Sequence, residues 1–144
     1  MTPNDDVQAI QRLIGEHFDA LRWDPDGRAD WERFSADFVP EASLFPAARP
    51  LRRHTLDAFI SRMDALAKGT LRSFEEKTLG MQVLVFGNIA VVLAASEMLE
   101  NGKEVNQDVS GYLLVKDRGK WSIAAHAWDK AGAGKPVPQH LRQR

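Results

Sequence analysis

The sequence predicts an α+β fold in which three N-terminal helices pack on the concave face of a strongly curved, mainly antiparallel sheet and form a cone with it. Apolar residues recur at helical spacing in the first half, but from about Leu71 to Lys130 they alternate with a period of two. Three turn signals divide this second region into four strands, at Gly87-Asn88, Asn101-Gly102 and Arg118-Gly119, because short hairpin loops need residues that tolerate positive φ.

The length of the first strand predicts the curvature of the sheet. A straight strand from Leu71 to Phe86 would span about 50 Å at roughly 3.3 Å per residue. A domain of this size has a radius of gyration on the order of only 14–15 Å. The sheet must therefore bend, and Gly80 and Gly111 are the expected bend or bulge points. A curved sheet covered by helices leaves a pocket between the two layers.

Composition limits the class of protein. The chain has 144 residues, of which 44% are hydrophobic and 27% charged, and its formal net charge is −1. We expect one domain over residues 1–130 and a flexible basic tail over 131–144. No basic field argues for nucleic acid, and no apolar run reaches membrane-spanning length, so neither is an expected partner. The N-terminus lacks the apolar core of an export signal, which makes the cytoplasm the expected location.

The first helix begins at acidic residues and ends near Arg22. Asn4 can cap it, while Asp5 and Asp6 suit the positive end of the helix dipole. Its apolar stripe consists of Val7, Ile10, Ile14, Phe18 and Leu21. Pro25 and Gly27 then interrupt the helical pattern.

A shorter helix and a capped one follow. The second carries Trp31, Phe34 and Phe38 on one face, and the segment after it suits at most a short edge strand at Ala42–Phe45 because it is rich in proline. The third begins after Thr55 and closes at Lys68-Gly69. Its inward side chains are Leu56, Phe59, Ile60, Met63 and Leu66.

The hairpins assign side chains to the two faces of the sheet. We pair Phe86 with Ile89, Glu100 with Lys103 and Asp117 with Lys120. The predicted pocket face carries Leu84, Phe86, Ile89, Val91, Leu114, Trp121 and Ile123, and, towards its polar end, Gln82, Glu97, Asp108, Ser110, Tyr112 and Asp129. The other face, which includes Val83, Val92, Leu113, His126 and Trp128, is apolar enough to predict a homodimer through the sheet.

Asp108 and Asp129 are the candidate catalytic residues, because the assumed pairing sets them opposite one another. Two neighbouring carboxylates cannot both ionise cheaply, so one pKa should rise into a range useful for acid–base catalysis. The alternative interpretation is a solvated strand end with Lys103 or Lys130 nearby.

The candidate ligand-binding residues are Tyr112, Gln82, Glu97 and Trp23. Tyr112 could hydrogen-bond a ligand carbonyl or be a packed core tyrosine, and Trp23 could cover the mouth of the cone or belong to the core. We predict no metal site, because there is no cysteine and no pair of histidines at ligand spacing.

The last strand begins with Gly119-Lys-Trp121-Ser-Ile123 and ends with Trp128-Asp129-Lys130. With three helices before the meander, this pattern resembles the nuclear-transport-factor-2-like superfamily, and within it the bacterial SnoaL-like and DUF4440-type proteins. The resemblance implies a cone that is dimeric through its sheet and has a pocket for small, often apolar molecules. Relatives include isomerases, cyclases, dehydratases and hydrolases. They often have histidine where this chain has Ala127.

Two functional hypotheses follow. The first is a small-molecule-binding protein that acts by acid–base chemistry without a cofactor, as an isomerase, dehydratase or hydrolase. The second is a non-catalytic ligand-binding or oligomerisation module. The two differ in whether Asp108, Asp129 and Tyr112 converge on an open cavity or are sealed by salt bridges.

Overall fold

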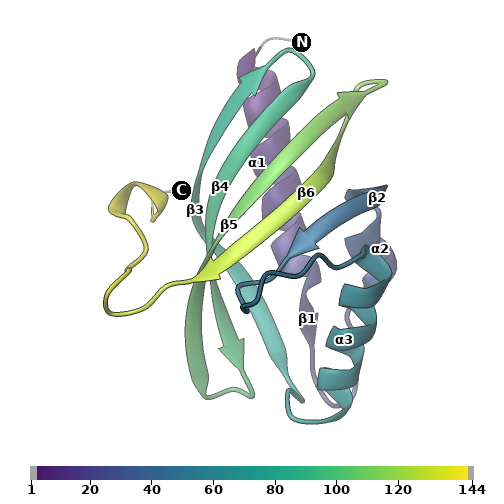
Figure 1. Cartoon of the computed structure of the whole chain (residues 1–144), viewed down its shortest axis with the longest axis vertical. Helices are drawn as coiled ribbons and strands as arrows, with labels where there is room; N and C mark the ends of the chain where they lie inside the picture. Colours follow the sequence, from purple (N-terminus) through teal and green to yellow (C-terminus); the bar gives the residue numbers. More distant parts are fainter. Residues whose placement is uncertain (1–2, 143–144) are drawn as a thin grey trace.

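The computed structural model describes residues 3–142 and confirms the predicted order of three helices followed by a long meander. Figure 1 shows the helices on one side of a curved sheet. The elements are α1 (Pro3–Ala20), β1 (Arg22–Trp23), α2 (Trp31–Ser35), β2 (Phe38–Phe45), α3 (Leu56–Lys68), β3 (Phe74–Phe86), β4 (Ile89–Glu100), β5 (Glu104–Asp117), β6 (Lys120–Lys130) and the 3₁₀ turn η1 (Gln139–Leu141).

The strands form one six-stranded sheet in the order β1-β3-β4-β5-β6-β2. All neighbours are antiparallel except β2, which runs parallel to β6. The second helix ends at Ser35, earlier than predicted, and Phe38 belongs to β2. Pro40 is tolerated in β2 because an edge strand does not need every backbone donor. None of the described helices is long and apolar enough to cross a membrane.

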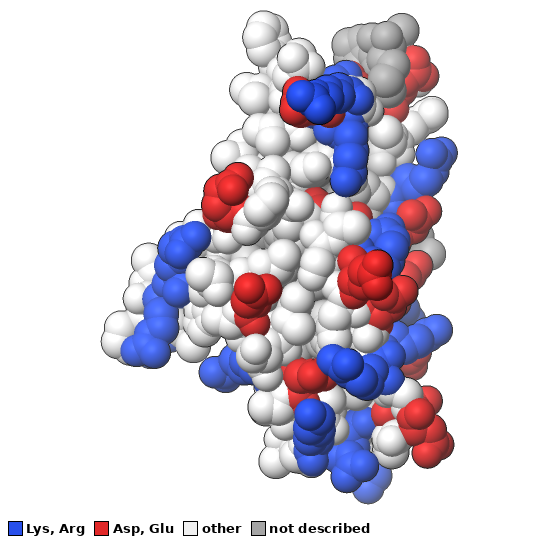
Figure 2. Space-filling view, turned by 90° about the vertical axis from the view of Figure 1, so that its right-hand side faces the viewer, with Lys and Arg blue, Asp and Glu red and all other residues white. Residues whose placement is uncertain are grey.

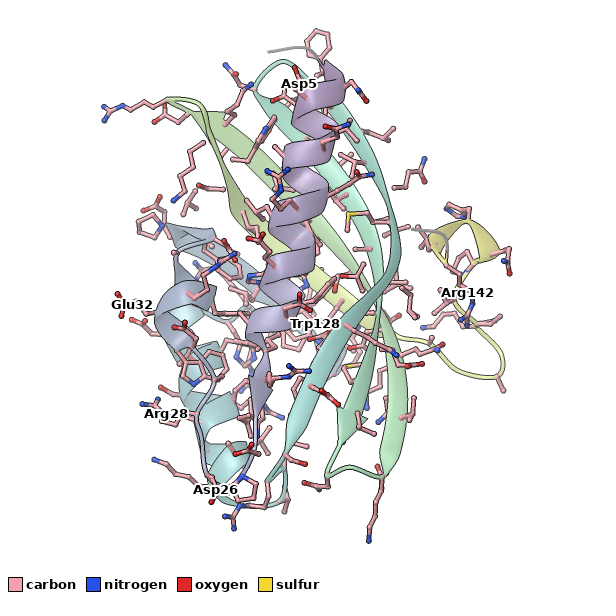
Figure 3. All side chains as sticks on the ribbon, turned by 180° about the vertical axis from the view of Figure 1, so that it is seen from behind. Asp5, Asp26, Arg28, Glu32, Trp128 and Arg142 are labelled. Atoms are coloured by element: carbon pink, nitrogen blue, oxygen red, sulfur yellow. The ribbon has the colours of Figure 1, made fainter. Side chains whose placement is uncertain are left out.

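Helix α1 lies across the concave face of the sheet (Figure 3). The carboxylate of Asp6, in the first turn of α1, is buried against the sheet. Asp6 accepts hydrogen bonds from Lys116 Nζ at 3.0 Å and from Trp121 Nε1 at 3.1 Å. The hydrogen bond from Lys116 is the main reason that the pKa of Asp6 lies below its usual range. Four of the five predicted stripe residues, Ile10, Ile14, Phe18 and Leu21, are buried in the main core.

The middle hairpin differs from the prediction by one residue. Glu100 pairs with Glu104, so the β4–β5 loop contains three residues, 101–103, rather than two. Because side chains alternate along a strand, a shift of one residue turns the side chains of β4, and of the part of β3 next to the first hairpin, to the face opposite to the one predicted from β5. Ala90, Val92 and Ala94 of β4 are therefore buried in the main core, while the predicted inward residues Leu84, Phe86, Ile89 and Val91 face outward and are exposed.

Two bulges interrupt the pairing of the long strands β3 to β6. The first leaves Leu79 unpaired next to Gly80, as predicted for that glycine. The second is not at Gly111 but in β6, where Leu113 pairs with Ala125 and Leu114 with Ile123, so that Ala124 is the extra residue. An extra residue reverses the alternation beyond it. His126 and Trp128 consequently face the concave side, and the prediction that they belong to a subunit interface is wrong.

The segment 131–142 is folded, in contrast to the flexible tail that we predicted. Figure 1 shows it leaving β6 and returning so that η1 lies against the outer face of the sheet. Val137 and Leu141 are buried against Ala95, with Leu79 and Val109 beside them. Lys135 pairs with Asp129 at 2.6 Å, and Arg142 donates to Gln107 at 3.1 Å. The segment is therefore held on the sheet by the burial of Val137 and Leu141, its two buried apolar side chains, on the apolar surface of the sheet.

Candidate functional site

A cavity of about 240 Å³ lies between the concave face of the sheet and the helices. Helices α1, α2 and α3 contribute mainly aromatic and aliphatic side chains together with His17, whereas β3, β4, β5 and β6 contribute the other polar groups. Trp128 projects from β6 towards the middle of the molecule, near the end of α1 (Figure 3). The cavity is lined by His17, Phe18, Leu21, Phe34, Phe59, Met63, Leu71, Phe74, Glu76, Met98, Glu100, Asn106, Asp108, Ser110, Tyr112, His126, Trp128 and Lys130.

Asp108 and Tyr112 line this cavity, as the sequence predicted, because the face of β5 was assigned correctly. The predicted pairing of Asp108 with Asp129 is wrong: Asp108 pairs with Lys130, and the β6 bulge turns Asp129 outward. There Asp129 is bound by Lys135, which is the main reason that its pKa is lowered.

The other three predicted ligand-binding residues also lie outside the lining. Gln82 is exposed on the outer face because the part of β3 after the bulge at Leu79 is reversed relative to the prediction, whereas Phe74 and Glu76, before the bulge, line the cavity. Glu97 is likewise on the outer face, where it accepts from Gln107 at 3.0 Å and lies 3.3 Å from Lys77 Nζ. Trp23 is a core residue. It donates to the Leu71 carbonyl at 2.8 Å and stacks on Phe74, so it supports the cavity wall from behind.

A buried histidine–aspartate pair reaches the cavity from the helical side. His17 of α1 is fully buried, and its Nδ1 lies 2.8 Å from Asp37 Oδ2. Asp37 is also bound by Arg33 at 2.7 Å. Burial lowers the pKa of His17, against the opposing effect of Asp37. The neutral ring therefore donates from Nδ1 to the carboxylate, and Nε2 keeps a lone pair that has no partner among the described residues.

A tyrosine and a second histidine lie on the concave face of the sheet beside this pair, and the rings of Tyr112 and His17 meet edge to face with centroids 6.3 Å apart. The ring of Tyr112 stacks on that of His126 with centroids 4.2 Å apart, and His126 Nε2 lies 2.9 Å from Ser110 Oγ. The Tyr112 hydroxyl makes no well-aligned hydrogen bond among residues 3–142, although Ser110 lies near enough to lower its pKa slightly. Burial, and then the charge of Glu76, raise the pKa of Tyr112 well above 10, so the hydroxyl keeps its proton and can donate it in a hydrogen bond.

Two carboxyl groups on the sheet have raised pKa values. Burial raises the pKa of Glu76 to about 8, although its Oε2 accepts a hydrogen bond from Ser96 at 2.7 Å. Burial also raises the pKa of Asp108 to about 6, and Lys130 opposes this effect. At neutral pH, Glu76 is mainly a carboxylic acid and Asp108 mainly a carboxylate. The cavity is thus lined by a group that can donate a proton, Glu76, and by one that can accept a proton, Asp108.

The sequence prediction missed Glu76, His17, Asp37 and His126. A signal for His17 was present, because it follows Ile14 by three positions and precedes Leu21 by four, which places it on the buried stripe of α1. Asp37 gives no such signal, since it meets His17 only when α2 packs beside α1. Among the described residues, no group of three or more histidine or acidic side chains is placed to hold a metal ion.

No family model and no curated protein matches the sequence. Solved structures do match the fold. A protein of unknown function from Silicibacter pomeroyi, described as NTF-2 like, has a TM-score of 0.63 and 20% identity, and the match covers 90% of this chain and 99% of that one. A protein from Streptomyces avermitilis, provisionally assigned as a dehydratase of the NTF2-like family, has a TM-score of 0.70 and 18% identity over 92% of this chain and 100% of that one.

A third structure, from Novosphingobium aromaticivorans, is provisionally described as a scytalone dehydratase. It has a TM-score of 0.67 and 15% identity, with 90% of this chain and 86% of that one covered. The narrower resemblance to SnoaL-like and DUF4440-type proteins stays a prediction. The curved sheet, the helices on its concave face and these matches together show that the chain has the nuclear-transport-factor-2-like fold.

Proposed function

We propose that this protein binds a small, mainly apolar molecule in the cone and dehydrates or isomerises it by acid–base chemistry. The observation that carries this proposal is the unpartnered Nε2 of His17 in a cavity that is also lined by Tyr112, whose hydroxyl makes no well-aligned hydrogen bond. A dry cavity of roughly 150 Å³ admits benzene. The observed volume of about 240 Å³ therefore suits a molecule of one or two rings. Two of the similar structures carry provisional dehydratase assignments, which is consistent with this chemistry.

Each polar group has a role in a dehydration. His17 Nε2 takes a proton from the carbon next to a carbonyl group, and Asp37 stabilises the imidazolium that forms. The Tyr112 hydroxyl donates a hydrogen bond to the carbonyl oxygen as that atom gains negative charge. Glu76 then protonates the departing hydroxyl group, so that a C–H and a C–O bond are broken and water leaves. In an isomerisation the protonated His17 would return the proton that it took to a different carbon, and Glu76 would keep its own proton.

Deuterium exchange tests the first step without knowledge of the natural substrate. Small cyclic β-hydroxy ketones incubated with the protein in D₂O should exchange the hydrogen next to the carbonyl faster than in buffer, as followed by proton NMR. Ketones that bind, as judged by shifts of cavity resonances, but do not exchange would contradict catalysis. Such a result would favour the alternative of a ligand-binding module.

We also propose that two copies associate through the outer face of the sheet. The part of that face that the tail leaves uncovered exposes Leu84, Phe86, Ile89, Val91, Leu93 and Leu113, with exposed fractions from 42% to 83%. Monomers rarely leave such a contiguous apolar surface in water. The net charge of −1 gives two copies little mutual repulsion. On the face that Figure 2 shows, by contrast, charges of both signs are intermixed.

Sedimentation at low micromolar concentration should give a dimer mass, and Val91→Lys should shift it to the monomer because a charge cannot be buried there without a partner. Val105→Lys is the matched control, since Val105 is 58% exposed at the other end of β5 and should leave the mass unchanged. A monomer mass for the unaltered protein would reject this interface.

A further inference from the structure

The charged groups of the cavity wall are unbalanced. Three carboxyl groups line it, Glu76 from β3, Glu100 from β4 and Asp108 from β5, although Glu76 is mainly protonated at neutral pH and adds little charge. Lys130 is the only lysine or arginine among the lining residues, and its side chain is exposed. The lowered pKa values of His17 and His126 leave both rings neutral, so neither supplies a positive charge.

Asp108 is the least satisfied of these carboxyl groups. It is only 9% exposed, and its Oδ1 has no hydrogen-bond partner among the described residues. Glu100 accepts from Asn106 at 2.9 Å, and Glu76 accepts from Ser96. A buried carboxylate oxygen without a donor is costly, and a donor that carries positive charge would relieve that cost most.

The remaining walls suit a cation attached to an apolar body. Six aromatic side chains line the cavity: Phe18, Phe34, Phe59, Phe74, Tyr112 and Trp128. The faces of aromatic rings attract cations and also remove apolar surface from water. The cavity therefore combines aromatic surface with an unpaired acidic group on its sheet side.

We propose that the ligand of this cavity carries a protonated amino group on a compact, mainly apolar ring, and that Asp108, supported by Glu100, binds the ammonium. This inference rests on the proposed function, because it names the class of molecule that enters the same cavity. Glu76 stays the acid and His17 the base, while the contact with Asp108 orients the ring between them.

The pH dependence of binding follows from the groups around Asp108. The ionisable groups on the neighbouring strands are Glu76 of β3, Glu100 of β4, and His126, Asp129 and Lys130 of β6, and His17 is the titratable group on the helical side. Of these, Lys130 lowers the pKa of Asp108, whereas Glu100 and Asp129 raise it. An ammonium needs the carboxylate form, so its affinity should rise as the pH rises through about 6.

Three compounds of nearly equal size test the proposal: benzylamine, benzyl alcohol and benzoate. Each is titrated at pH 7.5 and at pH 5.5, and binding is followed through the amide resonances of the cavity strands. Benzylamine should bind about tenfold more tightly than benzyl alcohol at pH 7.5, and benzoate more weakly than either. At pH 5.5 the preference for the amine should shrink.

Asp108→Asn should abolish the preference for benzylamine and its pH dependence, while binding of benzyl alcohol persists. Asp129→Asn removes the same charge on the outer face and is the matched control, so it should keep the preference. Equal binding of amine and alcohol to the unaltered protein, or an unchanged preference in Asp108→Asn, would overturn the inference and leave the proposed function standing. Binding of none of the three compounds would overturn both.

Discussion

Replacing His17 by glutamine is expected to slow deuterium exchange of a bound ketone about a thousandfold, because a positioned general base contributes roughly 10²–10⁴ in rate. The amide of glutamine is similar in size but cannot accept a proton at neutral pH. Affinity for benzyl alcohol should be nearly unchanged, since the aromatic walls stay in place. The loss should therefore appear in the exchange rate at saturating ketone and not in the concentration needed for saturation.

The substitution Asp37→Asn tests whether Asp37 acts by orienting the ring of His17, which remains the base that takes the proton. The variant keeps His17 but removes the carboxylate that holds the proton on Nδ1 and stabilises the imidazolium. We expect slower exchange and a changed pH profile, with a smaller loss than in His17→Gln. His140→Gln is the control, because His140 is exposed and lies outside the cavity lining. An unchanged exchange rate in His17→Gln would remove the base from the proposed mechanism.

Glu76→Gln is expected to make the folded state more stable than the unaltered protein at alkaline pH. The pKa of Glu76 is about 8 in the folded state against an ordinary value of 4.5, so between these values the folded chain holds a proton that the unfolded chain has released. Stability therefore falls as the pH rises through this window. At about 1.4 kcal/mol per pH unit, the unfolding free energy should fall by roughly 3–5 kcal/mol.

Urea unfolding at a series of pH values between 4.5 and 9 measures this effect. Other groups titrate in the same window, including Asp108, so the informative quantity is the difference between Glu76→Gln and the unaltered protein. That difference should grow in favour of the variant as the pH rises and level off above about 8. The same variant should still exchange the hydrogen next to the carbonyl, which is the step assigned to His17, but should lose the elimination of water, which needs the proton of Glu76. A difference that does not vary with pH would show that Glu76 is not buried as a neutral acid.

The local pattern was enough to predict the fold. The helices, the tight turns and the bulge at Gly80 each depend on a few neighbouring residues, and the corresponding signals lie within a few positions of one another. Asp108 and Tyr112 were also assigned to the same, correct face, because they are four residues apart in β5 and side chains alternate along a single strand whatever its neighbours are. These features follow from periodicity and turn chemistry without knowledge of the partner strands.

The rest of the site was decided by tertiary structure. One extra residue in the β4–β5 loop moved the side chains of Gln82 and Glu97 from the predicted cavity face to the outer face. One extra residue at Ala124 moved Asp129 to the outer face and brought His126 and Trp128 to the cavity face. Both choices depend on how a strand meets its neighbour, and a single-residue shift leaves the sequence pattern unchanged while it reverses every side chain beyond it. The pairing of His17 with Asp37 and the packing of Leu141 on the sheet are likewise contacts between distant segments, which only the packed chain brings within bonding distance.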